Sequence, residues 1–241
     1  MEIQLGEWIL FITIIAMVIY SLWESDKEKL AVISGRKTKI QAYKSAMLFM
    51  WLPTALLIYL IFIDVLRLSD LGLYWQGDIK NWLGLVFTCV TCIYFGYSVY
   101  IVATNPVERE AFREVVSDNH DWMLPSNRTE LQWFIGGLST SAGICEELLF
   151  RGFMIGVLDS HIGLIPSLLL SSAIFGLCHF YQGWKNVVRT GCIGLILGGI
   201  FIITESLWVI ILLHTVIDVY GGLVGYILNN SQPNPTERYF Q

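Results

Sequence analysis

Long runs of apolar residues, separated by shorter polar segments, dominate this sequence. These runs lack the strict alternation of a half-buried strand and are longer than the core-facing stripe of a soluble helix. A helix needs about 20 predominantly apolar residues to cross the hydrocarbon core of a bilayer. The pattern therefore predicts an all-α, polytopic transmembrane helical bundle of about seven spans, within a range of six to eight. The runs cover 8–23, 47–66, 82–104, 131–153, 164–180, 187–204 and 207–228.

The composition agrees with this fold class. Hydrophobic residues make up 55% of the chain, charged residues make up 15%, and the mean hydropathy is +0.60. We find no internal repeat and no sign of a second hydrophobic core, so we expect a single membrane domain over residues 1–241. Its expected parts are three peripheral spans over 1–104, an interfacial segment over 105–130, a bundle with the candidate chemistry over 131–228 and a polar tail over 229–241.

Basic residues are distributed unevenly between the polar segments. Segment 24–46 holds six Lys and Arg residues, whereas the loop after the second run offers only Arg67 and Lys80. By the positive-inside bias, we expect the N-terminus outside and loop 24–46 in the cytoplasm. No Lys or Arg precedes the first run, which favours a retained span over a removable signal. The net charge of −5 predicts no nucleic-acid surface.

The longest polar interruption predicts an amphipathic helix before the fourth span. In "NPVERE", Asn105 can cap a helix that begins at Pro106, and the apolar residues that follow share one face. Such a helix is expected to lie on the inner membrane surface. Asn127 and Glu130 can then cap the start of the fourth span.

Ionisable residues interrupt the later runs, where each costs about 2.5 to 3.5 kcal/mol at the bilayer centre. In "CEELLFRGF", Glu147 and Arg151 are four residues apart and are expected to form a structural ion pair on one helix face. Glu146 is turned about 100° away and faces a different neighbour. In "FGLCHF", His179 shares a helix face with Phe175.

The seventh run contains "HTVID", which places His214 and Asp218 on one face. Their simplest role is a buried hydrogen bond that steadies the bundle. Together with Glu146 and His179, however, they form a set suited to handling water. A carboxylate in an apolar pocket can act as a general base, and the same residue types can hold Zn²⁺ with an open position for water.

Three motifs in this order resemble those of a known family. "EELLFR", "FGLCH" and "HTVID" are similar to the EExxxR, FxxxH and HxxxN/D motifs of the CPBP family. This family groups CAAX-prenyl endopeptidases with bacteriocin-processing and immunity-associated membrane proteins, often labelled Abi. The resemblance covers about residues 125–228.

The resemblance implies an intramembrane endopeptidase, of CAAX or bacteriocin-peptide type, that attacks a peptide bond with water. Glu146 would activate the water with His179 as its partner, and His214 and Asp218 would bind a metal or stabilise the oxyanion. If Zn²⁺ is bound, the resemblance makes all four residues its candidate ligands, which would make the protein a metalloprotease. The CAAX enzymes have asparagine where this chain has Asp218, and an ionised aspartate cannot donate to an oxyanion.

The implied partners are the lipid bilayer and a membrane-associated peptide or protein. In eukaryotic relatives the substrate is a prenylated CAAX protein, whereas bacterial relatives act on peptides or membrane proteins. The expected location is the plasma membrane in a prokaryote and the endoplasmic reticulum membrane in a eukaryote. The sequence carries no signal for the oligomeric state.

Two other classes of function remain open. Intramembrane Glu, His, Asp and Arg also build proton-coupled carriers and ion transporters, although the halves of this chain show no inverted repeat. A non-catalytic immunity or scaffold protein could keep the same bundle.

The run boundaries place two candidate residues at different depths. Glu146 would lie about 22 Å along its span, at 1.5 Å per residue, whereas His179 would end its span near the inner face. We expect the motifs to converge nonetheless, with the weakly hydrophobic segment "GGLSTSAG" before Glu146 kinked, recessed or re-entrant.

Overall fold

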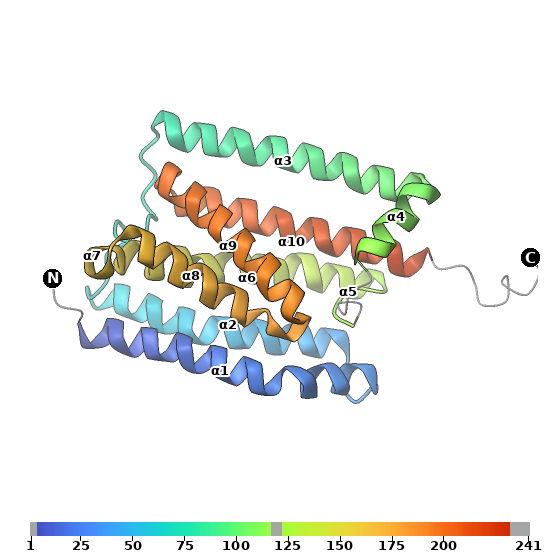
Figure 1. Ribbon diagram of the computed structural model, residues 1–241, viewed down its shortest axis with the longest axis horizontal. Helices are drawn as coiled ribbons and strands as arrows, with labels where there is room; N and C mark the ends of the chain where they lie inside the picture. The colour runs from blue at the N-terminus through green and yellow to red at the C-terminus, as the bar shows by residue number, and fades with distance from the viewer. Residues whose placement is uncertain (1–3, 117–121, 232–241) are drawn as a thin grey trace, which may run out of the picture.

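A computed structural model describes residues 4–116 and 122–231, and all regular structure in these two ranges is helical. Most of the long helices lie roughly side by side, with α1 and α3 at opposite edges (Figure 1). This arrangement confirms the all-α fold class. The elements are α1 (Leu5–Ile33), α2 (Lys39–Phe62), α3 (Ile79–Thr104), α4 (Pro106–Val116), α5 (Arg128–Trp133), η1 (Phe134–Ser139), α6 (Thr140–Glu146), η2 (Glu147–Val157), α7 (Asp159–Ile162), α8 (Leu164–Cys178), η3 (Phe180–Gln182), α9 (Trp184–Thr204) and α10 (Leu207–Asn230).

Five helices in the described ranges are long and apolar enough to cross a membrane. They are the first part of α1, Leu5–Glu24, and the whole of α2, α3, α9 and α10. These helices support an integral membrane protein. The remaining two of the seven predicted runs, 131–153 and 164–180, take other forms, so the count of seven spans stays a prediction.

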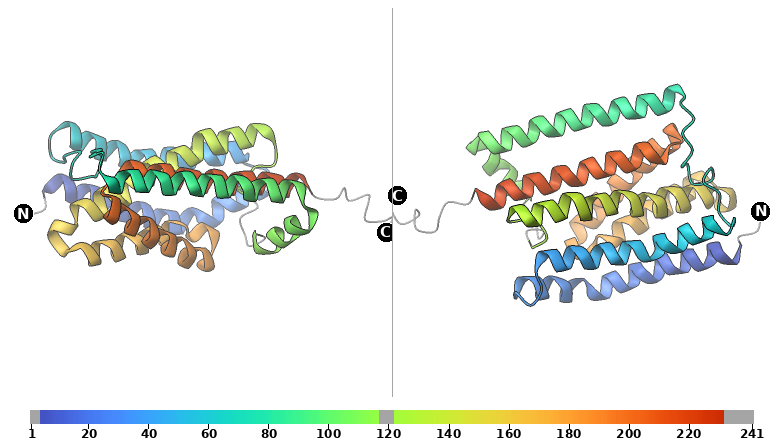
Figure 2. Two further views of the ribbon diagram at one scale, coloured as in Figure 1. Left: turned by 90° about the horizontal axis from the view of Figure 1, so that it is seen from above. Right: turned by 180° about the vertical axis from the view of Figure 1, so that it is seen from behind.

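The predicted run 131–153 lies within one uninterrupted helical rod from Arg128 to Val157. Its four parts, α5, η1, α6 and η2, follow one another without a break, as the rear view in Figure 2 shows. η1 and η2 are π-helical, a form that often accompanies functional sites. Of the three forms expected for the segment before Glu146, kinked, recessed or re-entrant, the re-entrant form does not fit, because η2 continues the rod for 11 residues beyond Glu146.

The predicted run 164–180 becomes the short helix α8. It has 15 residues and spans about 22 Å, which is less than a bilayer-crossing helix requires. The chain then reverses through η3 and returns as α9. The predicted run ends at residue 180, within two residues of the end of α8 at Cys178.

The polar segment 24–46, expected to be a loop, is mostly helical. α1 continues to Ile33 and α2 begins at Lys39, which leaves only a short turn between them. Thr38 closes this turn: its hydroxyl accepts from the Gln41 amide at 3.2 Å, and its own amide donates to the Gln41 side chain at 2.8 Å. The hydropathy pattern marked where the apolar stretch ends, but a helix can continue beyond it with polar residues.

α3 lies at the edge of the bundle and packs mainly on α10 (Figure 1). Most of its surface is exposed and apolar, as expected for a helix that faces lipid. Its start is fixed by Asn81, whose fully buried side chain donates to the Thr204 carbonyl at 2.7 Å and accepts from the amides of Gln76 and Gly77.

The interfacial segment contains the helix α4, which begins at the expected Pro106. The Asn105 side chain accepts from the amides of Val107 and Glu108, so it caps this helix as predicted. The expected Asn127 cap also forms, because its side chain accepts from the Glu130 amide at 2.9 Å. Placement of α4 at the membrane surface stays a prediction. Residues 117–121 of this segment, and 232–241 of the predicted tail, lie outside the described residues.

Candidate active site

The site begins where the rod packs closely against α10 at Gly143. Gly143 of α6 lies one turn before Glu147, and a methyl group at this position would overlap the Thr215 hydroxyl of α10. It would also lie 3.1 Å from the Ile211 carbonyl oxygen. Because only glycine fits without displacing α10, Gly143 sets the spacing that brings the rod beside His214.

Glu147 holds two partners at once. Its Oε1 atom accepts from Arg151 Nη1 at 2.7 Å and from His214 Nδ1 at 2.6 Å. Glu147 and Arg151 are fully buried, and His214 is 5% exposed. Arg151 also donates to the Gly194 carbonyl of α9 at 3.3 Å. A charged cluster of this kind is stable in an apolar interior only when its members are paired and hydrogen-bonded.

The ion pair between Glu147 and Arg151 is therefore present, but its carboxylate does more than balance the arginine. Helix spacing suggested Asp218 as the partner of His214, yet the hydrogen bond of His214 Nδ1 goes to Glu147. These two residues lie 67 positions apart in sequence, so no periodicity could indicate the contact. Because a carboxylate only accepts, Nδ1 carries the proton and Nε2 faces the other way.

The Nε2 atom of His214 faces the two remaining carboxylates. It lies 3.7 Å from Glu146 Oε2 and 3.8 Å from Asp218 Oδ2. Both separations exceed a direct hydrogen bond and suit groups that share a water molecule. The buried Oε2 atom of Glu146 has no hydrogen-bond partner in the described part of the chain. This oxygen is therefore available to a ligand.

His179 approaches the same region from the end of α8. Its Nδ1 atom donates to the Phe175 carbonyl at 2.9 Å, which leaves Nε2 unprotonated in the neutral ring. The ring of Phe175 connects the motifs: the Arg151 guanidinium lies 4.3 Å from its centre, and the rings of His179 and His214 lie 5.0 and 6.0 Å away. Phe175 thus packs against residues from all three motifs.

The two residues expected at different depths line the same cavity, and α8 is too short for a full bilayer crossing. His179 follows Cys178, where α8 ends, and so lies well before the point that a full span would reach. Glu146 lies near the middle of the rod, which enters from the opposite end. The expected difference in depth between Glu146 and His179 assumed that residues 164–180 cross the whole bilayer.

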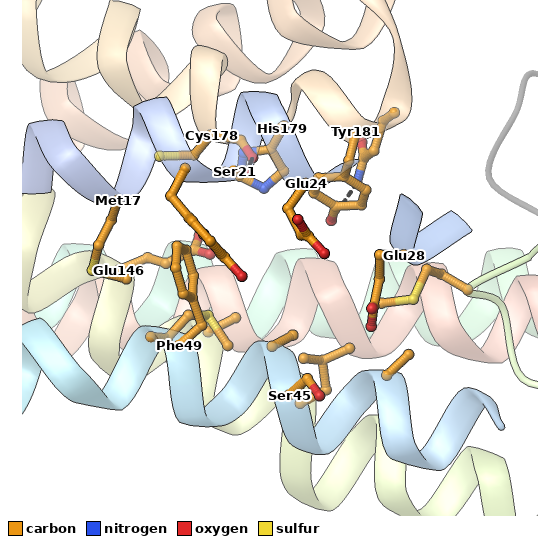
Figure 3. Close-up of a pocket in the computed structure, with 18 of the residues that line it drawn as sticks. Met17, Ser21, Glu24, Glu28, Ser45, Phe49, Glu146, Cys178, His179 and Tyr181 are labelled. Atoms are coloured by element: carbon orange, nitrogen blue, oxygen red, sulfur yellow. Dashed lines mark hydrogen bonds between the residues drawn. The ribbon is translucent and has the colours of Figure 1, made fainter. Parts of the chain in front are cut away.

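A cavity of about 560 Å³ joins three of the four candidate residues, Glu146, His179 and Asp218. His214 is not among the lining residues, but its Nε2 atom lies 3.7 Å from Glu146 and 3.8 Å from Asp218. Figure 3 shows Glu146 and His179 among the side chains that line the cavity. α1 and α2 form its other wall, which the expectation of peripheral first spans did not include. Their labelled residues in Figure 3 are Met17, Ser21, Glu24, Glu28, Ser45 and Phe49.

A metal ion such as Zn²⁺ needs several donor side chains directed at one point. Among residues 4–116 and 122–231, no three His, Cys, Asp or Glu side chains are placed so that they could hold one. Both imidazole Nδ1 atoms are bonded to protein acceptors, Phe175 and Glu147, which leaves only the two Nε2 atoms for a metal. The side chains as arranged do not fit Zn²⁺, and its binding stays a prediction.

Comparison with known proteins agrees with the motif pattern. No curated protein and no solved structure matches this chain. The family model described as "Type II CAAX prenyl endopeptidase Rce1-like" matches residues 128–220, from the start of α5 to the middle of α10. The matched segment contains Glu146, Glu147, Arg151, Phe175, His179, His214 and Asp218. The recognition made from the three motifs is thereby confirmed: this part of the chain has the pattern of the Rce1-like CAAX prenyl endopeptidases.

Proposed function

We propose that this protein is an intramembrane endopeptidase that hydrolyses a peptide bond of a membrane-associated protein or peptide. The observation that carries the proposal is the unpaired Oε2 atom of Glu146, which faces His214 Nε2 at 3.7 Å beside a large cavity. The family match supports a protease of the CAAX type at the family level. It does not favour the transporter or the non-catalytic alternative.

In the proposed reaction, Glu146 is the general base. Its carboxylate takes a proton from a water molecule held between Glu146, His214 and Asp218, and the hydroxide attacks the peptide carbonyl carbon. Glu146 then returns the proton to the leaving amine nitrogen, so that atoms and charge balance. The unprotonated Nε2 of His179 lines the same cavity and helps to orient the water.

Glu147 and Arg151 support this chemistry without touching the substrate. Glu147 fixes the His214 ring with Nε2 directed toward the water position, and Arg151 balances the buried charge of Glu147. A carboxylate that orients an imidazole through Nδ1 is a recurring arrangement in enzymes. In this proposal the ion pair of Glu147 and Arg151 supports catalysis as well as the stability that helix spacing led us to expect.

The cavity wall suggests what kind of substrate enters. α1 and α2 contribute mostly apolar side chains near the site, among them Met17, Phe49, Met50 and Pro53. An apolar peptide segment or a lipid-modified terminus would be stabilised there by loss of water from its surface. We therefore propose a CAAX-type or bacteriocin-type substrate anchored in the bilayer.

The experiment is a cleavage assay with purified protein in proteoliposomes. Peptides that end in a CAAX sequence, with and without a farnesyl group, are incubated with the protein and the products identified by mass spectrometry. We expect cleavage by wild type and by Glu108→Gln, which changes an exposed carboxylate on α4, and none by Glu146→Gln. Equal cleavage by the Glu146 variant would refute the assignment.

A further inference from the structure

A peptide hydrolase needs a hydrogen-bond donor for the negative charge that develops on the carbonyl oxygen. The four motif residues supply this poorly. Glu146 and Asp218 only accept when ionised, and Nε2 of the neutral His179 ring only accepts, because its Nδ1 carries the proton. His214 can donate from Nε2 only when its ring is protonated. The site described so far therefore activates water but offers the oxyanion at most one donor, a protonated Nε2 of His214.

Tyr181 supplies a donor in the same cavity. It lies on η3, two residues after His179, and lines the cavity together with Glu146, His179 and Asp218. Figure 3 shows its side chain beside the pocket, with a dashed line to its neighbour. That line is a hydrogen bond from Gln182 Nε2 to the Tyr181 hydroxyl oxygen at 2.8 Å. Since the oxygen accepts from Gln182, the hydroxyl proton remains free to donate.

The Tyr181 ring is fixed on two sides. It stacks on His179 with ring centres 6.0 Å apart and planes 29° from parallel. Trp122 meets it edge-on at 6.3 Å and 81°. A donor held by packing loses little freedom when the transition state forms, which is the condition for effective electrostatic stabilisation.

The backbone around Tyr181 is fixed as well. The amide of Gln182 donates to the His179 carbonyl at 3.0 Å, and the amide of Gly183 donates to the Phe180 carbonyl at 2.7 Å. Gly183 has φ of +92°, in the region that favours glycine. The Asn186 side chain donates to the Gln182 carbonyl at 3.0 Å. The turn thus holds Tyr181 at a constant position relative to His179.

We propose that Tyr181 is a further catalytic residue, whose hydroxyl donates a hydrogen bond to the oxyanion of the tetrahedral intermediate while Gln182 holds its oxygen. The tyrosine keeps its proton throughout, so no bond to it breaks. This inference rests on the proposed protease function. It also gives a physical account of Asp218, which stands where the CAAX enzymes have asparagine. If Tyr181 donates to the oxyanion, the residue at position 218 does not need an amide that donates.

The test compares Tyr181→Phe with wild type in the cleavage assay. Phenylalanine keeps both ring contacts and loses only the hydrogen bond from Gln182, so the variant should fold, with an unfolding midpoint lowered no more than that of the control below. We expect kcat to fall about 100- to 1,000-fold, as for loss of one oxyanion donor, with KM within about twofold. Tyr43→Phe is the matched control: it removes another phenol hydroxyl, which donates to the Met123 carbonyl at 2.6 Å, and should lower the unfolding midpoint but leave kcat intact.

A second measurement separates this inference from the proposed function. A substrate-like peptide phosphonate carries the tetrahedral charge without being cleaved, so its binding needs no turnover. We expect Tyr181→Phe to weaken phosphonate binding at least about tenfold and to leave binding of the uncharged parent peptide unchanged. If wild type cleaves and Tyr181→Phe matches it in kcat and in phosphonate affinity, the role of Tyr181 is wrong and the protease stands. If wild type neither cleaves nor binds the phosphonate, both are wrong.

Discussion

The Nδ1 atom of His214 donates to the Oε1 atom of Glu147 at 2.6 Å, across 67 positions of sequence. The same oxygen accepts from Arg151. One carboxylate thus joins the rod to α10 and directs His214 Nε2 toward Glu146. The stability of this region and the orientation of its imidazole depend on the same atom.

Replacement of Glu147 by glutamine should therefore affect both stability and activity. The buried Arg151 loses its counter-charge, and breaking a buried pair in this way costs about 3 to 5 kcal/mol. We expect a lower unfolding midpoint in detergent and a lower kcat in the fraction that remains folded. Arg151→Met in the Glu147→Gln background removes the stranded charge, so it should restore part of the stability but not the kcat. A Glu147→Gln protein with wild-type stability and rate would show that this contact does not support the site.

Gly143→Ala should separate α6 from α10. The added methyl group would overlap the Thr215 hydroxyl and press on the Ile211 carbonyl oxygen. We expect a lower unfolding midpoint and slower cleavage, because His214 would move away from Glu147. The matched control is Gly136→Ala in the same rod, where an added methyl group meets nothing within 4 Å. If both variants behave alike, the close approach at Gly143 does not position the site.

Much of the fold could be predicted from hydrophobic patterning, because five of the apolar runs correspond to helices long enough to cross a bilayer. The ion pair of Glu147 and Arg151 follows from helical spacing, which is a local property. The helical ends of α1 and α2 beyond their apolar runs could not be predicted in this way. Their boundaries depend on turns and on tertiary packing, which hydropathy does not measure.

The candidate site was predictable in its residues but not in its connections. Three motifs nominated Glu146, His179, His214 and Asp218, and the structure brings them to one region. The hydrogen bond between Glu147 and His214 depends on how two distant helices pack. The cavity walls on α1 and α2 carried no motif. The sequence indicates Tyr181 only by its position two residues after His179. Whether its side chain reaches the cavity depends on the turn at η3, which the sequence pattern does not predict.

Phe175→Leu should loosen the contacts among the three motifs. The guanidinium of Arg151 loses the ring face 4.3 Å away, an interaction of about 2 kcal/mol when desolvated. We expect a lower unfolding midpoint and a lower kcat, because His179 and His214 both pack against this ring. Phe201→Leu on α9 removes a buried ring near Gly72 instead, and should lower stability without a matching loss of kcat. If Phe201→Leu lowered kcat more than Phe175→Leu did, this role of Phe175 would be contradicted.

Removal of metal tests the zinc prediction directly. The described side chains offer no set of three that fits an ion, and the proposed proton transfers use only Glu146 and water. We therefore expect the cleavage rate to stay within about twofold after treatment with a chelator, with no stoichiometric zinc in the purified protein by elemental analysis. A loss of activity that added Zn²⁺ restores would show that the zinc prediction is right and that the side chains rearrange to bind it.

The most direct measurement is the single-turnover cleavage rate of wild type and Glu146→Gln in the same proteoliposomes, with one peptide substrate at saturating enzyme. Glutamine keeps the size of the side chain but cannot accept the proton from water. The account predicts a rate about 100- to 10,000-fold lower for the variant, with an unchanged unfolding midpoint. A variant that cleaves at the wild-type rate would contradict the claim that Glu146 activates the water.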